Sequence, residues 1–286
     1  MLYFPTLKLN MEYEIKPHRK FDFGLTELWS YKELFYFFAW RDIKVKYKQT
    51  VLGFLWAILQ PFITMLVFVF FFGKMVQSSS LNMPYPVFVL SGLLIWNIFS
   101  SGVVNAGNSM IHNSNIIKKI YFPRLIIPLS AILVSVFDFL MAFVIFLAVM
   151  IYFKFKSNLD IHWISFILLL PVSIVISCIA SFGVGTLLAA LNIKYRDFRY
   201  LIPFMIQTLL FVTPVIYPIN IVEPSYLKLI LALNPVYAAI EILRGGMTGI
   251  FPNNDLILIS IISSLVLLFV GIFFFRKTEY YFADLI

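Results

Sequence analysis

The chain has 286 residues, of which 61% are hydrophobic and only 13% are charged. Soluble globular proteins carry about 25% charged residues, so this chain has too few to cover a water-facing surface. Its formal net charge of +8 comes from lysines and arginines that flank long apolar segments, which argues for a polytopic membrane protein and against a nucleic-acid partner. The single cysteine, Cys178, excludes an internal disulfide, and the three histidines are too scattered to form a metal site.

The N-terminal region is predicted to contain a polar tail and an interfacial helix. Residues 1–24 have no continuous apolar stretch and no small-residue cleavage site, so we predict a cytoplasmic tail rather than a cleaved signal peptide. Residues 25–48 combine aromatic side chains with a basic cluster, which is typical of an amphipathic helix lying at the headgroup level of anionic lipid. Packing against the soluble domain of a partner is the alternative. The residues expected to make these contacts are Trp29, Tyr31, Trp40, Arg41 and Lys44.

Six apolar segments are predicted to cross the membrane. A helix needs about 20 apolar residues to cross a hydrocarbon core of roughly 30 Å. The first such segment contains no charged residue at all. The predicted spans are 51–72, 87–104, 125–153, 163–191, 201–217 and 256–275. The expected fold class is therefore an all-α polytopic membrane domain over residues 25–286.

The segment between the fifth and sixth spans is predicted to form short re-entrant helices. It is moderately apolar, but prolines and a glycine pair interrupt it. The piece 236–244 would be roughly 14 Å long as a helix, which is too short to cross a membrane. We expect Asn234-Pro235 to start this helix and Gly245-Gly246 to end it.

Glu241 and Arg244 are neighbours on one face of that short helix, because they are three residues apart. An exposed pair with this spacing contributes only about 0.2–0.5 kcal/mol, whereas a partly buried pair would be costly to break. We predict that the pair holds the hairpin closed, and that exchanging the two charges would recover part of the function lost in single mutants.

The distribution of lysine and arginine orients the chain. Seventeen of the 22 lie in the segments placed in the cytoplasm, and five lie outside. Cytoplasmic loops carry an excess of these residues, so both termini are predicted to be cytoplasmic. The five outer residues are Lys74, Lys154, Lys156, Lys228 and Arg244.

The chain has no motif for nucleotide hydrolysis or for common catalytic chemistry. GxxxxGK[ST], HExxH, CxxC and GxSxG are all absent, so we predict no catalytic residue and no metal ligand. Asp138 is the only charge deep in a predicted span, whereas ion-driven carriers use several. We interpret Asp138 as a structural hydrogen-bonded residue, with a coupling role as the alternative. Uphill transport would require energy from a partner.

Five segments resemble one family of membrane proteins. They are WRDIKVKYKQTVLGFLWAILQP at 40–61, FGK at 72–74, NSNIIKKIYFPR at 113–124, NIKYRDFRY at 192–200 and LNPVYAAIEILRGG at 233–246. Together they resemble the type-2 ABC transporter permeases that export polysaccharides such as O-antigen, capsule or teichoic acid. The resemblance extends over nearly the whole chain from about Glu27, with the segments in the right order relative to the spans.

The resemblance implies a homodimer in the inner membrane of a bacterium, docked on two copies of a separate ATPase subunit. ATP and magnesium would be bound by that subunit, so no cofactor is expected in this chain. The substrate would be a lipid-linked glycan. A coupling helix at 108–121 would contact the ATPase through Asn108, Ile111, His112, Asn113 and Ile116. The hairpin would form an outer gate containing Pro235, Tyr237, Glu241 and Arg244.

Aromatic residues of the first and fifth spans are candidates for the translocation path that the resemblance implies. Sugar rings have apolar CH faces, and aromatic side chains offer a large rigid face, with a polar edge in Tyr and Trp. Lipid contact or core packing is the alternative for each residue. The candidates are Phe54, Trp56, Phe62, Phe204, Phe211 and Tyr217.

Two other functions compete with export of a glycan. A membrane glycosyltransferase or polymerase would need catalytic acids or an acidic metal-binding motif on an aqueous loop, which Glu223 and Asp255 alone do not supply. An ABC-2 permease for a small molecule is the second alternative. The basic helix before the first span and its RDIKVKYKQT motif argue against it.

Overall fold

The computed structural model describes residues 25–48, 53–76, 83–157, 159–195, 197–251 and 253–282. These residues form helices and connections without any strand. The predicted tail, 1–24, and the first two residues of the first predicted span lie outside the described part of the chain.

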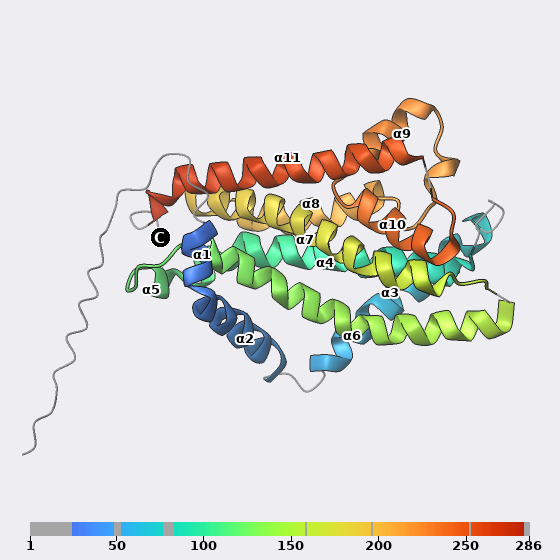
Figure 1. The fold of residues 1–286 in the computed structure, drawn as a ribbon, viewed down its shortest axis with the longest axis horizontal. Coiled ribbons are helices and arrows are strands. Elements are labelled where there is room, and N and C mark those ends of the chain that lie inside the picture. Colours follow the sequence, from blue (N-terminus) through green and yellow to red (C-terminus); the bar gives the residue numbers. More distant parts are fainter. Residues whose placement is uncertain are drawn as a thin grey trace, which may run out of the picture.

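The helices of the described segments form an elongated bundle (Figure 1). In chain order they are α1 (Leu25–Ser30), α2 (Lys32–Lys48), α3 (Gly53–Val76), α4 (Tyr85–His112), α5 (Ser114–Ile117), α6 (Ile126–Ser157), α7 (Trp163–Lys194), α8 (Phe198–Val212), the 3₁₀ helix η1 (Ile219–Ile221), α9 (Ser225–Ala232), α10 (Tyr237–Thr248) and α11 (Asn254–Glu279). The long helices run lengthwise. The loop around α5 and the C-terminal end of α11 lie at one end of the bundle, and α9 and α10 lie toward the other (Figure 1).

Five helices, α3, α4, α6, α7 and α11, are long and apolar enough to cross a membrane. The all-α polytopic fold class is therefore confirmed. The fifth predicted span, 201–217, is shorter than expected, because α8 has 15 residues and a length of only about 22 Å. The helix ends at Val212. Thr213 is extended, as expected of a residue that precedes a proline.

The segment predicted to be re-entrant forms two short helices, α9 and α10, which are bent by 103° relative to each other. Such a pair is either a broken span or a re-entrant loop. The expected end of the short helix was wrong. Gly245-Gly246 lies inside α10, which continues to Thr248. Gly249 ends the helix because it adopts a left-handed conformation with φ of 73°, which glycine takes without steric cost.

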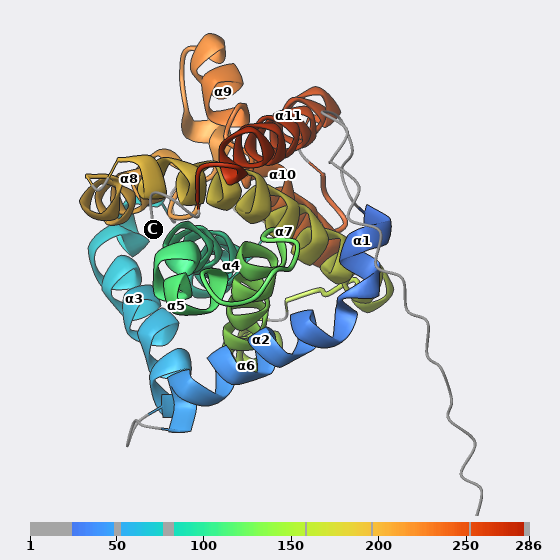
Figure 2. The ribbon, with the colours of Figure 1, turned by 90° about the vertical axis from the view of Figure 1, so that its left-hand side faces the viewer.

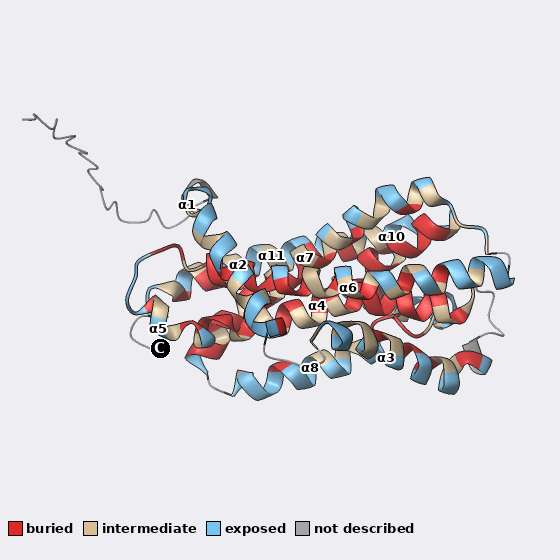
Figure 3. Cartoon of the chain, turned by 90° about the horizontal axis from the view of Figure 1, so that it is seen from below, coloured by how far each residue is buried: buried red, intermediate tan, exposed pale blue. Residues whose placement is uncertain are grey.

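Helix α4 is the centre of the bundle. In Figure 2 it is surrounded by α3, α6, α7 and α8. Of its most apolar 18 residues 78% are buried within the protein, compared with 17% for α3. Buried residues follow α4 and the sides of the helices that face it, whereas outer surfaces are exposed (Figure 3). Helix α4 therefore runs through the core of the bundle from one end to the other. Most of the surface of α3 is available for contact with lipid or a partner.

Candidate functional site

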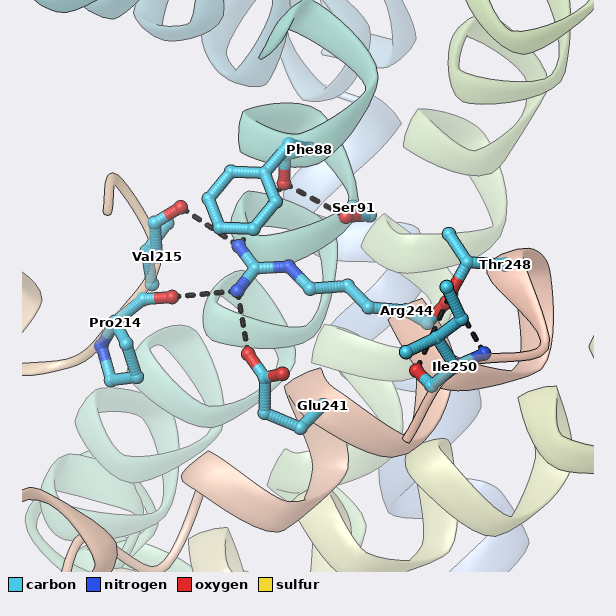
Figure 4. Close-up of polar contacts among 8 residues, drawn as sticks. All are labelled: Phe88, Ser91, Pro214, Val215, Glu241, Arg244, Thr248 and Ile250. Carbon is cyan, nitrogen blue, oxygen red and sulfur yellow. Dashed lines mark hydrogen bonds and ion pairs between the residues drawn. The ribbon is translucent and has the colours of Figure 1, made fainter. Parts of the chain in front are cut away.

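The guanidinium group of Arg244 on α10 is buried, and α10 lies toward the end of the bundle opposite α5 (Figure 1). Figure 4 shows the polar contacts of Arg244. Its Nη1 donates to Glu241 Oε1 and to the Pro214 carbonyl, both at 2.8 Å. Its Nη2 donates to the carbonyls of Val215 at 2.9 Å and Phe88 at 3.1 Å. The guanidinium carbon also lies 3.5 Å from the centre of the Phe88 ring. Arg244 thus joins α10, α4 and the segment after α8.

Arg244 donates hydrogen bonds to backbone carbonyls in addition to its ion pair with Glu241. Pro214 and Val215 lie beyond Val212, the last residue of α8, so their carbonyl groups have no hydrogen-bond partner within that helix. Arg244 supplies donors to both carbonyls. A glutamate at position 244 could not, because an ionised carboxylate only accepts hydrogen bonds. The geometry therefore removes the reason to expect that exchanging the charges would restore function.

Gly92 on α4 provides the space that Arg244 occupies. A Cβ atom at position 92 would lie 2.7 Å from Arg244 Nη2 and 3.2 Å from the Val215 carbonyl oxygen. Either distance requires a neighbour to move. The small residues Ser91-Gly92 indicate close packing around the second span, but the sequence does not identify Arg244 as the neighbour of Gly92, because the two are far apart in the chain.

The start of α10 is tied to the same end of the bundle. The Asn234 side chain accepts from the Val236 amide at 3.0 Å and donates to Thr213 Oγ1 at 2.6 Å. The Pro235 carbonyl accepts from Ser264 Oγ on α11 at 2.7 Å. Tyr237, the remaining predicted gate residue, is fully buried. The structure therefore brings Pro235, Tyr237, Glu241 and Arg244 together in one packed region.

Helix α2 packs one face against the bundle and exposes the other. Phe38 is buried, and its ring centre lies 5.7 Å from that of Phe122. Among the predicted interfacial residues, Tyr31 is half-buried and Arg41 is partly buried. The exposed ones are Trp29, Trp40 and Lys44. Aromatic and basic groups therefore share the outward face of α2, and its placement at the membrane interface stays a prediction.

Asp138 on α6 is bound by the C-terminal end of α2. Lys46 Nζ lies 2.6 Å from Asp138 Oδ2, and the Tyr47 hydroxyl donates to Asp138 Oδ1. Burial raises the pKa of Tyr47, and the hydrogen bond and negative charge of Asp138 raise it further. Tyr47 therefore stays protonated and remains a donor. These bonds support the structural interpretation of Asp138.

The predicted coupling helix, 108–121, is not a separate element. Asn108, Ile111 and His112 belong to the last turns of α4, and only Ser114–Ile117 form a further short helix. Nothing before Asn113 interrupts helical geometry, so the buried span simply extends beyond the apolar part of its sequence. The change from apolar to polar residues in the sequence therefore does not mark the end of α4.

Most of the predicted coupling residues are covered by the protein. Asn113 is buried. Its Oδ1 accepts from Arg41 Nη2 at 2.7 Å, and its Nδ2 donates to the Ser109 carbonyl at 2.8 Å. Asn108, Ile111 and Ile116 are partly buried, whereas His112 is exposed. The other exposed residues of the predicted coupling segment are Asn115, Lys118, Lys119, Ile120 and Tyr121.

The candidate path residues of α3 have different surroundings. Trp56 lines a cavity of about 570 Å³ between α2, α3, α4, α6 and α8. Phe54 stacks on Tyr47, with 4.7 Å between the ring centres. Phe62 is half-buried against the core. Of these three residues, the structure brings only Trp56 to the cavity.

The three candidates from the fifth predicted span also have different surroundings. Phe204 and Phe211 are exposed on α8. Tyr217 lies after the helix, is half-buried, and donates from its hydroxyl to the Val212 carbonyl at 3.0 Å. Within one copy of the chain, none of the three lines the cavity.

Comparison with known proteins identifies the family. The sequence profile of the ABC-2 type transporter family matches residues 33–248. The O-antigen export system permease protein RfbA of Klebsiella pneumoniae is 30% identical over 247 residues, covering 86% of this chain and 92% of that protein. A protein of the same name from Myxococcus xanthus is 30% identical over 212 residues, covering 73% of this chain and 78% of its own length.

A further relative is named for the transport of a different molecule. The polysialic acid transport protein KpsM of Escherichia coli is 26% identical over 248 residues, covering 84% of this chain and 91% of that protein. These relatives are transport permeases by name, and the alignments span nearly their entire length. Since the family profile covers most of the chain, this multi-pass membrane protein belongs to the ABC-2 type transporter family.

Proposed function

We propose that this chain is the permease subunit of an ABC exporter that moves a lipid-linked polysaccharide out across the cytoplasmic membrane of a bacterium. The polysaccharide would be of the O-antigen, capsule or teichoic acid type. The observation that carries the proposal is the similarity, over 84–86% of this chain, to permeases named for O-antigen export and polysialic acid transport, within one family. Both cargoes are polysaccharides, which favours the same substrate class here.

Energy would come from two copies of a separate subunit that binds ATP and magnesium, because this sequence has no phosphate-binding glycine loop. The end of the bundle around α5 is the proposed docking surface. His112, Asn115 and Ile120 are exposed there, and Ile120 is 62% accessible. The covered residue Asn113 would transmit motion from this surface through its bond to Arg41 on α2.

The functional unit would be a homodimer with the glycan path between its two copies. Helices α3 and α8 lie on the same side of the bundle (Figure 2) and expose large aromatic side chains. Phe70, Phe71 and Phe204 are 80%, 69% and 66% exposed. If two copies faced each other here, these helices would present rigid apolar faces to sugar rings without trapping charges.

The function is tested by deleting the gene in its host and restoring it on a plasmid. The deletion should remove the glycan from the cell surface while full-length lipid-linked glycan accumulates inside. Plasmid-borne wild-type chain should restore export only together with an active ATPase subunit. Short or absent glycan inside the deletion strain would instead favour a glycosyltransferase or polymerase. Unchanged surface glycan would contradict the proposal.

A further inference from the structure

A row of polar side chains on α4 faces the cavity that Trp56 lines. It contains Asn97, Ser101 and Asn105, which are four residues apart and therefore share one face of the helix, with Ser100 beside them. Polar side chains within a membrane-spanning helix are costly, and they usually bond to other protein groups. Here they border an open space of about 570 Å³.

The two asparagine amides in this row are available to a ligand. Within the described part of the chain, the side chains of Asn97 and Asn105 make no hydrogen bond, whereas those of Asn108 and Asn113 bond to backbone carbonyls. Ser101 Oγ donates to the Asn97 carbonyl at 2.5 Å, which leaves its lone pairs facing the cavity. Each free amide offers two donors and one acceptor oxygen.

The remaining walls favour a neutral, hydroxyl-rich ligand. Trp56 and Gln60 of α3 line the cavity, so it combines an aromatic side chain with a third amide. Lys46 and Asp138 also line the cavity, but they form an ion pair at 2.6 Å and so largely neutralise each other. A phosphate group is bound best where cations can pair with it. A sugar ring has hydroxyls for amides and CH faces for an indole.

The size and position of the cavity agree with this chemistry. Small-molecule sites measure about 300–1,000 Å³, so a volume of 570 Å³ suits a short piece of glycan rather than a polymer. The lining comes from the middle parts of α4, α6 and α8 and from the first half of α3. The cavity therefore lies near the middle of the bundle, between the α5 end and the buried Arg244, which contacts Phe88 in the first turn of α4.

We propose that this cavity binds a neutral sugar unit of the glycan. Asn97 and Asn105 hydrogen-bond to its hydroxyl groups, and Trp56 packs against the ring. The site rests on the proposed export function and adds to it a defined binding position within each copy of the chain. The sugar would be held here, near the middle of the bundle, before it reaches the proposed gate around Arg244.

The first test replaces both amides by apolar side chains of similar size. The double variant Asn97→Leu/Asn105→Leu should reduce glycan export by about tenfold, the effect expected when two modest hydrogen bonds are lost. Asn97→Ser/Asn105→Ser keeps hydrogen-bonding groups and should recover part of the export. Ser130→Ala is the control, because Ser130 on α6 is buried and does not line the cavity. Wild-type export by the leucine variant would overturn the proposal.

The second test measures occupancy directly, in the permease–ATPase complex reconstituted in lipid nanodiscs. With Cys178 replaced by alanine, alkylation of a Ser101→Cys variant by N-ethylmaleimide is followed in time. The probes are lipid-linked glycan extracted from the host membrane and the same lipid after the glycan has been hydrolysed off. Only the intact probe should slow alkylation, and it should leave a Tyr280→Cys control unaffected. Equal protection by the stripped lipid, or no protection, would overturn the proposal.

The two proposals can fail separately. Unchanged surface glycan in the deletion strain contradicts export of that glycan by this chain. Loss of surface glycan in the deletion strain, combined with normal export by the leucine variant and no protection of Ser101→Cys, rejects the sugar site alone.

Discussion

Arg244 acts as a hydrogen-bond donor as much as a charge. It lies among three backbone carbonyls, the Glu241 carboxylate and the ring of Phe88, and is only 3% exposed. The two carbonyls that follow α8 depend on it for donors. A residue that satisfies so many buried groups holds three segments in a single arrangement.

Arg244→Met should therefore destabilise the protein strongly. Breaking one partner of a buried pair costs about 3–5 kcal/mol, and the carbonyls also lose their donors. Arg244→Lys should be intermediate, because one ammonium group cannot reproduce the planar fork of the guanidinium group. Thermal unfolding in detergent measures stability, and ion flux into vesicles measures leak. Recovery of stability in the Glu241→Arg/Arg244→Glu exchange would show that the ion pair alone matters.

Gly92→Ala tests the space around Arg244 without changing a charge. The new Cβ would press on Arg244 Nη2, and overpacking of this kind costs about 1–3 kcal/mol. Gly73→Ala on α3 is the matched control, since a Cβ there meets its nearest neighbours at an ordinary 3.7 Å. The control should be neutral or stabilising, because alanine favours helix by about 1 kcal/mol. Equal melting temperatures of the two variants would contradict the close contact.

At the level of elements, α2 is attached to the bundle at two places. Arg41 bonds to Asn113 at the end of α4, and Lys46 and Tyr47 bond to Asp138 on α6. The first attachment lies beside the proposed ATPase-docking surface. The second lies beside the cavity. Movement of the α5 end would consequently be passed to α2 and to the edge of the cavity.

Asn113→Leu should loosen α2 while leaving the bundle folded. The bond from Arg41 involves a charged donor and contributes about 1.5–3 kcal/mol. Hydrogen exchange of the α2 amides should therefore accelerate in this variant. Asn115→Leu is the control, because Asn115 is exposed two residues further along. Identical exchange of α2 in both variants would reject the attachment.

At the scale of the whole molecule, the distribution of cations predicts a single orientation. One of the five cations first assigned to the outside, Arg244, is buried within the protein. The other four, Lys74, Lys154, Lys156 and Lys228, lie in α3, α6 and α9. The contrast with the seventeen proposed cytoplasmic cations becomes larger. Ser114 lies at the α5 end of the bundle, and Asn253 immediately precedes α11 at the other end.

Labelling with a membrane-impermeant thiol reagent tests this orientation. In a Cys178→Ala background, an Asn253→Cys variant should react in intact cells, whereas Ser114→Cys should react only after the cells are permeabilised. A third site chosen from the sequence, Ser79, lies outside the described residues. Reaction of Ser114→Cys in intact cells would reverse the predicted topology.

The sequence by itself determined the features that depend on local composition. A backbone in lipid must satisfy its hydrogen bonds within its own helix, so apolar length alone predicts five spans that the structure contains. The interruptions by proline likewise predict a short bent pair before the last span. Family motifs identify the class of transporter because they are contiguous in the sequence.

Only the tertiary structure decided what each polar side chain does. The pairing of Glu241 with Arg244 was visible as a three-residue spacing, but the carbonyls of Phe88, Pro214 and Val215 were not. Asn97 lies within α4, and Asn113 directly follows this helix. Asn97 faces a cavity, whereas Asn113 is buried against Arg41. Hydrogen-bond partners from distant segments are chosen by packing, and no local pattern records them.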